Sequence, residues 1–368
     1  MGALRGEFLC ATKVLGTTLA LETAMTPFAY AGAVALAVPF VFVYRSLRAS
    51  NLHPFNEPSF VFRILYALYN SSLGQTIHNY MLTSHQNSSA GIPHTVACTA
   101  VDEFESGFSV SYVPFLEDNY AYFIVDRATG KTAVVDPADP ESVMTAFDHL
   151  KEIMNRTDLT LTMICCTHKH MDHAGGNLAL KSKFKNVQVV AGTKETVLGQ
   201  TVAAQHEQTV YLGTTPVLVL ETPCHTIGHV VFFAGDTTHG GALFSGDTLF
   251  LGGCGKFFEG NAPLMYNTLY KVILGGKLPL ATTKVYCGHE YSQSSLEFGI
   301  QVEPDNVALR RKLETVIGQR KERLPTVPSV LKDELEYNVF LRCCGPSSAT
   351  IRSRLSLAPA ADNGSMED

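Results

Sequence analysis

The segment THKHMDHAGG, residues 167–176, contains four residues of types that bind metal ions: His168, His170, Asp172 and His173. A protein core offers few hydrogen-bond partners to three neighbouring imidazole rings, so a purely structural role for the whole set is disfavoured. Imidazole and carboxylate groups together suit zinc, iron or manganese. The spacing therefore indicates a metal site, and the alternative is a solvated polar turn.

Three further loops each contain one candidate ligand. His225 lies in the motif PCHTIGH, Asp247 in SGDTLF and His289 in GHEY. Each motif follows a short apolar stretch that is typical of a buried strand. Because loops at strand ends commonly carry chemistry, we expect the four loops to meet on one rim of the fold.

The seven donors of these loops exceed what one tetrahedral ion can bind. Two ions about 3.5–4 Å apart would use all seven, provided that one carboxylate lies between them. Such a pair of ions can share a hydroxide and polarise a carbonyl group. The chemistry that this donor set favours is therefore hydrolysis.

Short apolar segments alternate with helical patterns through most of the chain. Strands are expected at residues 108–113, 120–125, 131–135, 161–166, 187–191 and 217–221, with further strands up to residue 250. Helices are expected over 139–154 and 304–324. The second helix has one apolar face, formed by Leu309, Leu313, Val316 and Ile317. This order predicts an α/β architecture of packed layers. Asp136, at a strand end, is interpreted either as a partner of a ligand histidine or as a turn residue.

The composition fits a large folded core, since 46% of the 368 residues are hydrophobic and 17% are charged. The net charge is −6, and the basic residues are dispersed along the chain. Charge therefore gives no reason to expect a nucleic acid as partner.

The N-terminal region contains an uncharged run of 22 residues, from Thr23 to Tyr44. About 20 apolar residues suffice to span a bilayer, so this run predicts a membrane anchor. A buried helix of a globular domain and an organelle presequence are the alternatives. We expect a membrane-associated protein whose catalytic domain faces the cytoplasm, with the mitochondrion as the alternative location.

Taken together, the motifs THKHMDHAGGN, PCHTIGH, SGDTLF, GCGKFFEG and GHEY resemble those of the glyoxalase II (hydroxyacylglutathione hydrolase) family of the metallo-β-lactamase superfamily. The resemblance extends from about residue 108 to residue 342. It implies an αββα sandwich with a C-terminal helical domain. The N-terminal hydrophobic segment is loosely similar to that of a membrane-anchored glyoxalase II-like protein.

The resemblance also implies two zinc ions per chain, or iron or manganese in their place. The ligands implied for the first ion are His168, His170 and His225. Those implied for the second ion are Asp172, His173 and His289. Asp247 is expected to bridge the two ions, and Asp172 and Asp247 are the expected catalytic carboxylates.

The implied reaction is hydrolysis of S-(2-hydroxyacyl)glutathione thioesters, such as S-lactoylglutathione, to glutathione and a 2-hydroxy acid. This reaction belongs to methylglyoxal detoxification, and its nucleophile would be a hydroxide bound between two metal ions. Lys256 and Tyr291 match family residues that contact glutathione, whereas Phe258 replaces a tyrosine. Arg352 and Arg354 lack the Arg-x-x-Lys spacing of the family.

Two other functions stay open as alternatives. The first is a mononuclear iron persulfide dioxygenase, which the long chain after His289 disfavours. The second is a membrane-tethered scaffold with weak hydrolase activity, which the complete ligand set disfavours.

The chain is expected to consist of five parts: an anchor or targeting segment, a linker, a catalytic domain, a helical substrate-binding domain and a flexible tail. Their expected ranges are, in this order, 1–48, 49–107, 108–288, 289–355 and 356–368.

Overall fold

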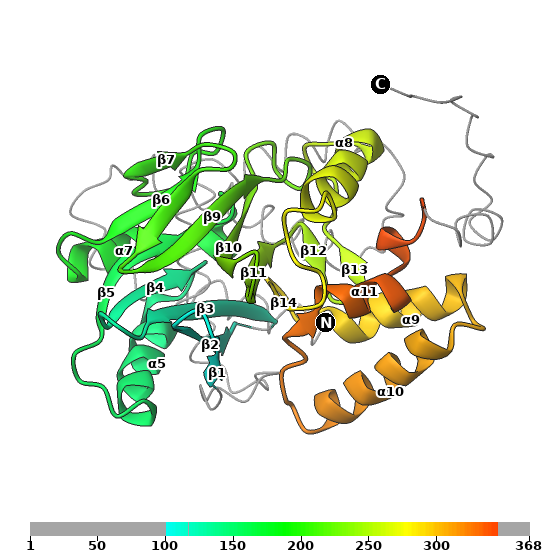
Figure 1. Ribbon diagram of the computed structural model, residues 1–368, viewed down its shortest axis with the longest axis horizontal. Helices are drawn as coiled ribbons and strands as arrows, with labels where there is room; N and C mark the ends of the chain where they lie inside the picture. The colour runs from blue at the N-terminus through cyan, green and yellow to red at the C-terminus, as the bar shows by residue number, and fades with distance from the viewer. Residues whose placement is uncertain (1–100, 117, 345–368) are drawn as a thin grey trace, which may run out of the picture. The chain divides into compact units, whose positions relative to one another are not determined.

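The computed structural model describes residues 101–116 and 118–344 (Figure 1). The predicted anchor at 1–48 and the predicted tail at 356–368 lie outside these ranges. In the described part of the chain, two large sheets pack face to face, and helices cover their outer faces.

The first sheet has seven strands, which follow one another in chain order. They are β1 (Val101–Glu103), β2 (Phe108–Phe115), β3 (Asn119–Asp126), β4 (Lys131–Val135), β5 (Thr160–Cys165), β6 (Gln188–Gly192) and β7 (Val202–Ala204). Neighbours from β1 to β4 pair antiparallel, and those from β4 to β7 pair parallel. β1 lies inside the range 49–107 that we predicted as a linker. It pairs with β2, and the side chain of Asp102 also accepts hydrogen bonds from Lys284 (3.0 Å) and Tyr286 (2.6 Å) of the second sheet.

The second sheet has six strands in the order β15-β14-β11-β10-β9-β8. They are β8 (Thr209–Leu212), β9 (Thr215–Glu221), β10 (Val230–Asp236), β11 (Gly240–Gly246), β14 (Thr283–Cys287) and β15 (Ser329–Val330). Only β11 and β14 pair parallel within this sheet. A small ribbon follows β11 and consists of β12 (Leu249–Phe250) and β13 (Gly253–Cys254).

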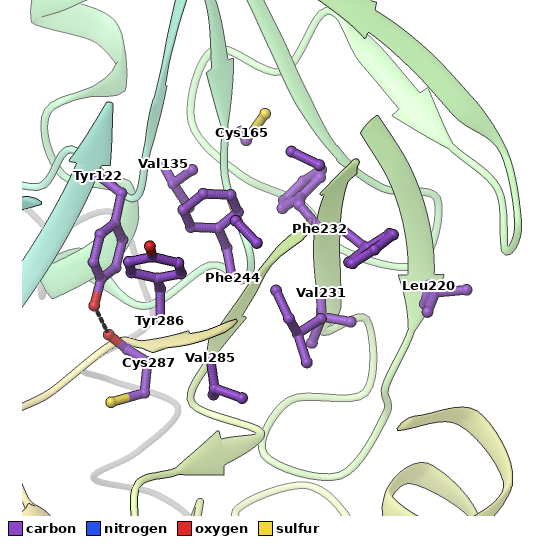
Figure 2. Close-up of a cluster of buried hydrophobic side chains, with 14 of the residues drawn as sticks. Tyr122, Val135, Cys165, Leu220, Val231, Phe232, Phe244, Val285, Tyr286 and Cys287 are labelled. Carbon is purple, nitrogen blue, oxygen red and sulfur yellow. Dashed lines mark hydrogen bonds between the residues drawn. The ribbon is translucent and has the colours of Figure 1, made fainter. Parts of the chain in front are cut away.

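The main hydrophobic core lies between the two sheets. Along β3, Tyr122 belongs to this core, whereas its neighbour Phe123 belongs to the core on the other side of the first sheet. This alternation follows from the two-residue period of a strand. Figure 2 shows Tyr122 together with Phe244 and Tyr286, and its hydroxyl donates a hydrogen bond to the carbonyl oxygen of Cys287 (2.5 Å). Residues of both sheets are therefore locked together directly behind the loop that carries His289.

Helices complete the outer layers. α5 (Pro140–Ile153) and α7 (Asn177–Lys183) bury Phe147, Leu150 and Leu180 in the core that they share with the first sheet. α8 (Ala262–Tyr266) and the π-helical η2 (Asn267–Ile273) add apolar side chains to the core on the second sheet. The predicted αββα sandwich is thereby confirmed.

The C-terminal part of the described chain is helical, as predicted. It consists of α9 (Ser292–Val302), α10 (Val307–Lys321), α11 (Leu331–Tyr337) and the 3-10 helix η3 (Val339–Leu341). Figure 1 shows α9, α10 and α11 in orange and red next to one another, and Leu296, Leu309 and Val316 pack between them. α10 begins later than predicted because the side chain of Asn306 caps it and accepts a hydrogen bond from the backbone N–H of Leu309 (3.1 Å).

The described helices do not support the predicted membrane localisation. The longest of them, α10, has 15 residues, whereas about 20 apolar residues are needed to cross a bilayer. Over residues 101–116 and 118–344, no helix combines the length and the apolar character of a transmembrane span. These helices therefore give no support to the prediction of a membrane-associated protein. The run from Thr23 to Tyr44, which motivated it, lies outside the described residues.

Candidate metal centre

The donors predicted from the sequence meet in one place, because each follows the end of a strand. His168 follows β5, His225 follows β9, Asp247 follows β11 and His289 follows β14. His170 stands immediately before the short helix α6 (Met171–Ala174), which carries the two remaining donors, Asp172 and His173. All seven donors are thereby brought into three overlapping groups of residues.

Each group has ligand atoms within 4.8 Å of one another. The first group contains His168, His170 and His225. The second group contains Asp172, His173 and His289. A third group, which consists of His168, His173 and Asp247, overlaps both.

In the first group, three ring nitrogens face one another. Nδ1 of His170 lies 2.9 Å from Nε2 of His168 and 3.0 Å from Nε2 of His225. Burial lowers the pKa of His168 and His170 well below the usual value and also lowers that of His225. The rings are therefore neutral at pH 7, which is the state in which imidazole binds a metal ion.

In the second group, nearby carboxylates raise the pKa of a donor histidine. Nε2 of His173 lies 3.2 Å from Nε2 of His289, and Oδ2 of Asp172 lies 3.5 Å from Nε2 of His289. Burial alone would lower the pKa of His173, but the carboxylates of Asp247, Asp172 and Asp136 outweigh it and raise this pKa to about 9. The carboxylates thus favour positive charge at this point, as a bound cation would supply.

Asp247 lies between the two groups. Its Oδ1 is 3.3 Å from Nε2 of His173, and its Oδ2 is 3.3 Å from Nε2 of His225 and 3.4 Å from Nε2 of His289. Oδ1 is buried, and no described residue donates a hydrogen bond to it. A buried carboxylate oxygen without a donor is costly unless a cation or another partner satisfies it. The donor set, the lone oxygen and the neutral rings therefore fit a metal centre.

Hydrogen bonds outside the donor set orient the rings. Nδ1–H of His173 donates to Asp136, Nδ1–H of His289 donates to Asp118 and Nδ1–H of His225 donates to the carbonyl oxygen of Lys256, each at 2.9 Å. Because Nδ1–H of each ring makes this hydrogen bond, Nε2 is the ring nitrogen that faces the centre.

The ring of His168 is oriented in the same way. The hydroxyl of Thr167 donates to Asp136 (2.7 Å), so its oxygen is left to accept from Nδ1–H of His168 (3.0 Å). Asp136 thus contacts the donor His173 directly and the donor His168 through Thr167, which supports the first of its two interpretations. Sequence reasoning missed Asp118, Thr167 and the Lys256 carbonyl, because none of them belongs to a metal-binding spacing.

A glycine allows the backbone to approach Asp247 closely. A Cβ atom at Gly288 would lie 2.4 Å from Oδ1 of Asp247 and 2.7 Å from Cε1 of His173. Any side chain at this position would therefore displace donors of the centre. The motif GHEY thus contributes a compact backbone as well as the donor His289.

The predicted substrate residues lie beside the donors. The ring of Tyr291 stacks on His289, with centroids 4.8 Å apart and planes at 2°, and Tyr291 is 36% exposed. On the other group, the ring of Phe258 lies 5.0 Å from that of His225. Nζ of Lys256 lies 5.2 Å from the Phe258 ring centroid. The exposed Tyr291 ring and the half-buried Phe258 ring therefore flank different groups of the centre.

Comparison with known families agrees with the fold and the donor cluster. The model of the metallo-β-lactamase superfamily matches residues 116–289, and that of the hydroxyacylglutathione hydrolase C-terminus matches residues 290–364. An αββα sandwich with clustered His and Asp donors at its strand ends is thus a metallo-β-lactamase fold. A solved metallo-β-lactamase structure from Staphylococcus aureus is 21% identical, with a TM-score of 0.49 over 70% of this chain and 69% of that chain.

Two relatives show which family within this superfamily the chain resembles. The chain is 42% identical to a protein of Arabidopsis thaliana named hydroxyacylglutathione hydrolase cytoplasmic, over 64% of this chain and 89% of the relative. It is also 42% identical to hydroxyacylglutathione hydrolase of Methylococcus capsulatus, over 67% of this chain and 90% of the relative. The chain belongs to the hydroxyacylglutathione hydrolase family, also called glyoxalase II. The name of the Arabidopsis relative is a second finding against the predicted membrane localisation.

Proposed function

We propose that the protein hydrolyses S-(2-hydroxyacyl)glutathione thioesters, such as S-lactoylglutathione, to glutathione and a 2-hydroxy acid. The observation that carries this proposal is the convergence of seven His and Asp donors around Asp247, in a chain of the hydroxyacylglutathione hydrolase family. The helices α9, α10 and α11 after His289 also support it over a persulfide dioxygenase, for which a long helical C-terminal part was not expected.

The proposed cofactor is a pair of zinc ions, although the same nitrogen and oxygen donors suit iron or manganese. His168, His170 and His225 would hold the first ion. Asp172, His173 and His289 would hold the second ion. When bound, such ions supply Lewis acidity, which polarises the thioester carbonyl and lowers the pKa of water. Asp247, whose carboxylate lies next to His225 of the first group and to His173 and His289 of the second group, would bridge them.

The remaining roles belong to residues of the chain itself. Asp172 and Asp247 are the proposed catalytic carboxylates, because both offer oxygens at the centre. Asp118, Asp136 and the Lys256 carbonyl keep the ring protons on the outer side of the site. The ammonium of Lys256 is proposed to bind a glutathione carboxylate, with Tyr291 and Phe258 beside the peptide. Phe258 contributes no hydroxyl, so its contact is apolar.

The predicted division into a catalytic part at 108–288 and a substrate-binding part at 289–355 stays a prediction. It is supported by the change from sheets to helices after β14 and by the separate family models on either side of residue 289.

One experiment separates the candidate functions. The full chain is purified, its zinc, iron and manganese are counted, and S-lactoylglutathione hydrolysis is compared with oxygen uptake on glutathione persulfide. We expect two ions per chain and thioester hydrolysis without oxygen uptake. One iron per chain with oxygen uptake would replace the proposal by the dioxygenase, and neither activity would favour the scaffold.

A further inference from the structure

Lys169 lies between two donors of the first group, His168 and His170, but its side chain serves another purpose. Its Nζ lies 2.7 Å from Oε1 of Glu259 and 3.6 Å from Oε1 of Glu195. The side chain of Lys169 is 24% exposed, that of Glu259 is 20% exposed and that of Glu195 is 1% exposed. These ion pairs are thus largely shielded from water. Coulomb attraction between the charges is therefore stronger than it would be at an open surface.

The two glutamates reach the loop that carries His225. Oε2 of Glu259 accepts a hydrogen bond from the backbone N–H of Ile227 (2.7 Å). The hydroxyl of Thr226 donates to Oε2 of Glu195. Both contacts fall within two residues of His225. The loop of His225 is therefore connected to Lys169 through Glu195 and Glu259.

Glu259 also belongs to the loop that supplies Lys256 and Phe258. Its backbone N–H donates to the carbonyl oxygen of Cys224 (3.3 Å), next to His225. The carbonyl oxygen of Lys256 in the same loop accepts from Nδ1 of His225 (2.9 Å). One ammonium therefore joins the loop of His168 and His170, the loop of His225 and the loop proposed to contact glutathione.

We infer that Lys169 is a positioning residue for the first metal group and for the substrate loop, an inference that rests on the function proposed above. Asp118 and Asp136 orient His289 and His173 of the second group, whereas the ion pairs of Lys169 lead to the loop of His225, which belongs to the first group alone. Loss of the ammonium leaves Glu195 and Glu259 facing each other without their shared cation. The loops should then separate, and the first group should lose its ion before the second group does.

The test uses the full chain loaded with zinc. Lys169→Met, Lys169→Arg and wild type are dialysed against increasing chelator concentrations, and zinc per chain is counted before any activity is measured. Lys169→Met should retain about one ion where wild type retains two, because loss of a group that supports ligands weakens metal binding about 10- to 100-fold. Lys169→Arg should recover most of the difference, since its guanidinium can reach both carboxylates.

Lys194→Met is the matched control. Nζ of Lys194 lies 2.7 Å from Oε2 of Glu221, and the Lys194 side chain is 60% exposed. This ion pair does not connect two of the loops that carry donors. This variant should keep two ions and wild-type turnover. Lys169→Met should also raise KM for S-lactoylglutathione and lower kcat, because the substrate loop and the first group move together.

Several outcomes would overturn the inference. These are wild-type metal retention by Lys169→Met, an equal loss in Lys194→Met, or no recovery in Lys169→Arg. Should Lys169→Met fail to fold, Glu259→Gln replaces it, because glutamine keeps an acceptor for Ile227 and removes only the charge. A smaller loss of the same ion is expected there, and unchanged retention would refute the role. Metal retention is measured without substrate, so a failure of the proposed thioester reaction is seen separately.

Discussion

At the scale of single residues, each donor depends on a partner that fixes its ring or carboxylate. Asp247 has the most demanding position, because three imidazoles lie within 3.4 Å of its oxygens. Burial would raise its pKa, but His289, His173 and His225 outweigh this effect and hold the pKa well below the usual range. The carboxylate is therefore charged at pH 7 and is suited to lie between two cations.

Asp247→Ala should lose at least one ion per chain and nearly all thioester hydrolysis. Orienting partners of metal ligands are worth about 10- to 100-fold, so loss of the bridging carboxylate itself should exceed that range. Metal analysis and kcat measure the two effects. Asp236→Ala, at an exposed hairpin, serves as control and should match wild type. Retention of two ions by Asp247→Ala would refute the bridge.

Lys256 offers a test of the substrate contact, because Lys256→Ala keeps the backbone carbonyl that holds His225. The ammonium is expected to contribute equally in the ground and transition states, so KM should rise and kcat should stay near wild type. A partly exposed pair is worth up to about 1 kcal/mol, or about fivefold in KM. The effect should shrink at high salt, because ions screen the pair.

The comparison variant for Lys256 is Lys277→Ala, since Lys277 pairs with Glu207 on the surface. It should leave both kinetic constants unchanged. An unchanged KM for glutathione thioesters in Lys256→Ala would mean that another residue selects the thiol carrier.

At the scale of elements, one buried aspartate joins the end of β3 to the turn between β8 and β9. Asp126 accepts hydrogen bonds from the backbone N–H and the hydroxyl of Thr129, from both groups of Thr214 and from the hydroxyl of Thr215. Burial would raise the pKa of Asp126, but these donors outweigh it and lower the pKa well below the usual range. The two sheets are thus connected at this edge through a single carboxylate.

The carboxylate of Asp126 should make the free energy of unfolding depend on pH. Since the folded pKa is depressed, its contribution is complete above the unfolded value of about 3.9 and is lost as the pH falls towards the folded pKa. Asp126→Asn should therefore unfold more easily at pH 7, by about 2 kcal/mol, and its stability should fall less than that of wild type between pH 5 and pH 3. Urea unfolding at several pH values measures the difference.

Asp148→Asn provides the comparison, because the Asp148 side chain is 77% exposed. It should follow the wild-type pH dependence. Parallel curves for wild type and Asp126→Asn would show that the carboxylate is not ionised preferentially in the folded state.

At the scale of the whole molecule, the centre is formed by segments from Asp118 to His289. Its donors come together only when both sheets have folded and packed on each other. Strand β4 pairs parallel with β5, and β11 pairs parallel with β14, so their carboxyl ends bring donors to the same side. The packing of Tyr122 on Phe244 and Tyr286 then fixes one sheet against the other (Figure 2). Metal binding and global stability should therefore be linked.

Removal of metal from the full chain should lower Tm. Ligand that binds only the folded state stabilises it by RT ln(1 + [L]/Kd), which is about 4 kcal/mol at a thousandfold excess over Kd. Calorimetry with and without chelator measures the shift, and added zinc should reverse it. Asp247→Ala should respond less than wild type. A Tm that chelator leaves unchanged would argue against a metal that is bound only in the folded state.

The sequence by itself determined the donor types, their order and the strands that precede them. His168, His225, Asp247 and His289 each follow an apolar segment, and this pattern is local, so residue type and periodicity suffice to find it. The family motifs added the expectation of an αββα sandwich, which the two sheets confirm. The membrane localisation was wrong because it rested on hydropathy alone.

Only the tertiary structure decided which neighbours orient the donors. Asp118 and His289 are 171 positions apart, and Asp136 and His173 are 37 apart, so no local pattern relates them. Their contacts depend on strand pairing and on the packing of one sheet on the other, which are properties of the folded chain. The same holds for the choice of ring nitrogen at each histidine and for the ion pairs of Lys169, because both follow from distances that exist only after the loops have met.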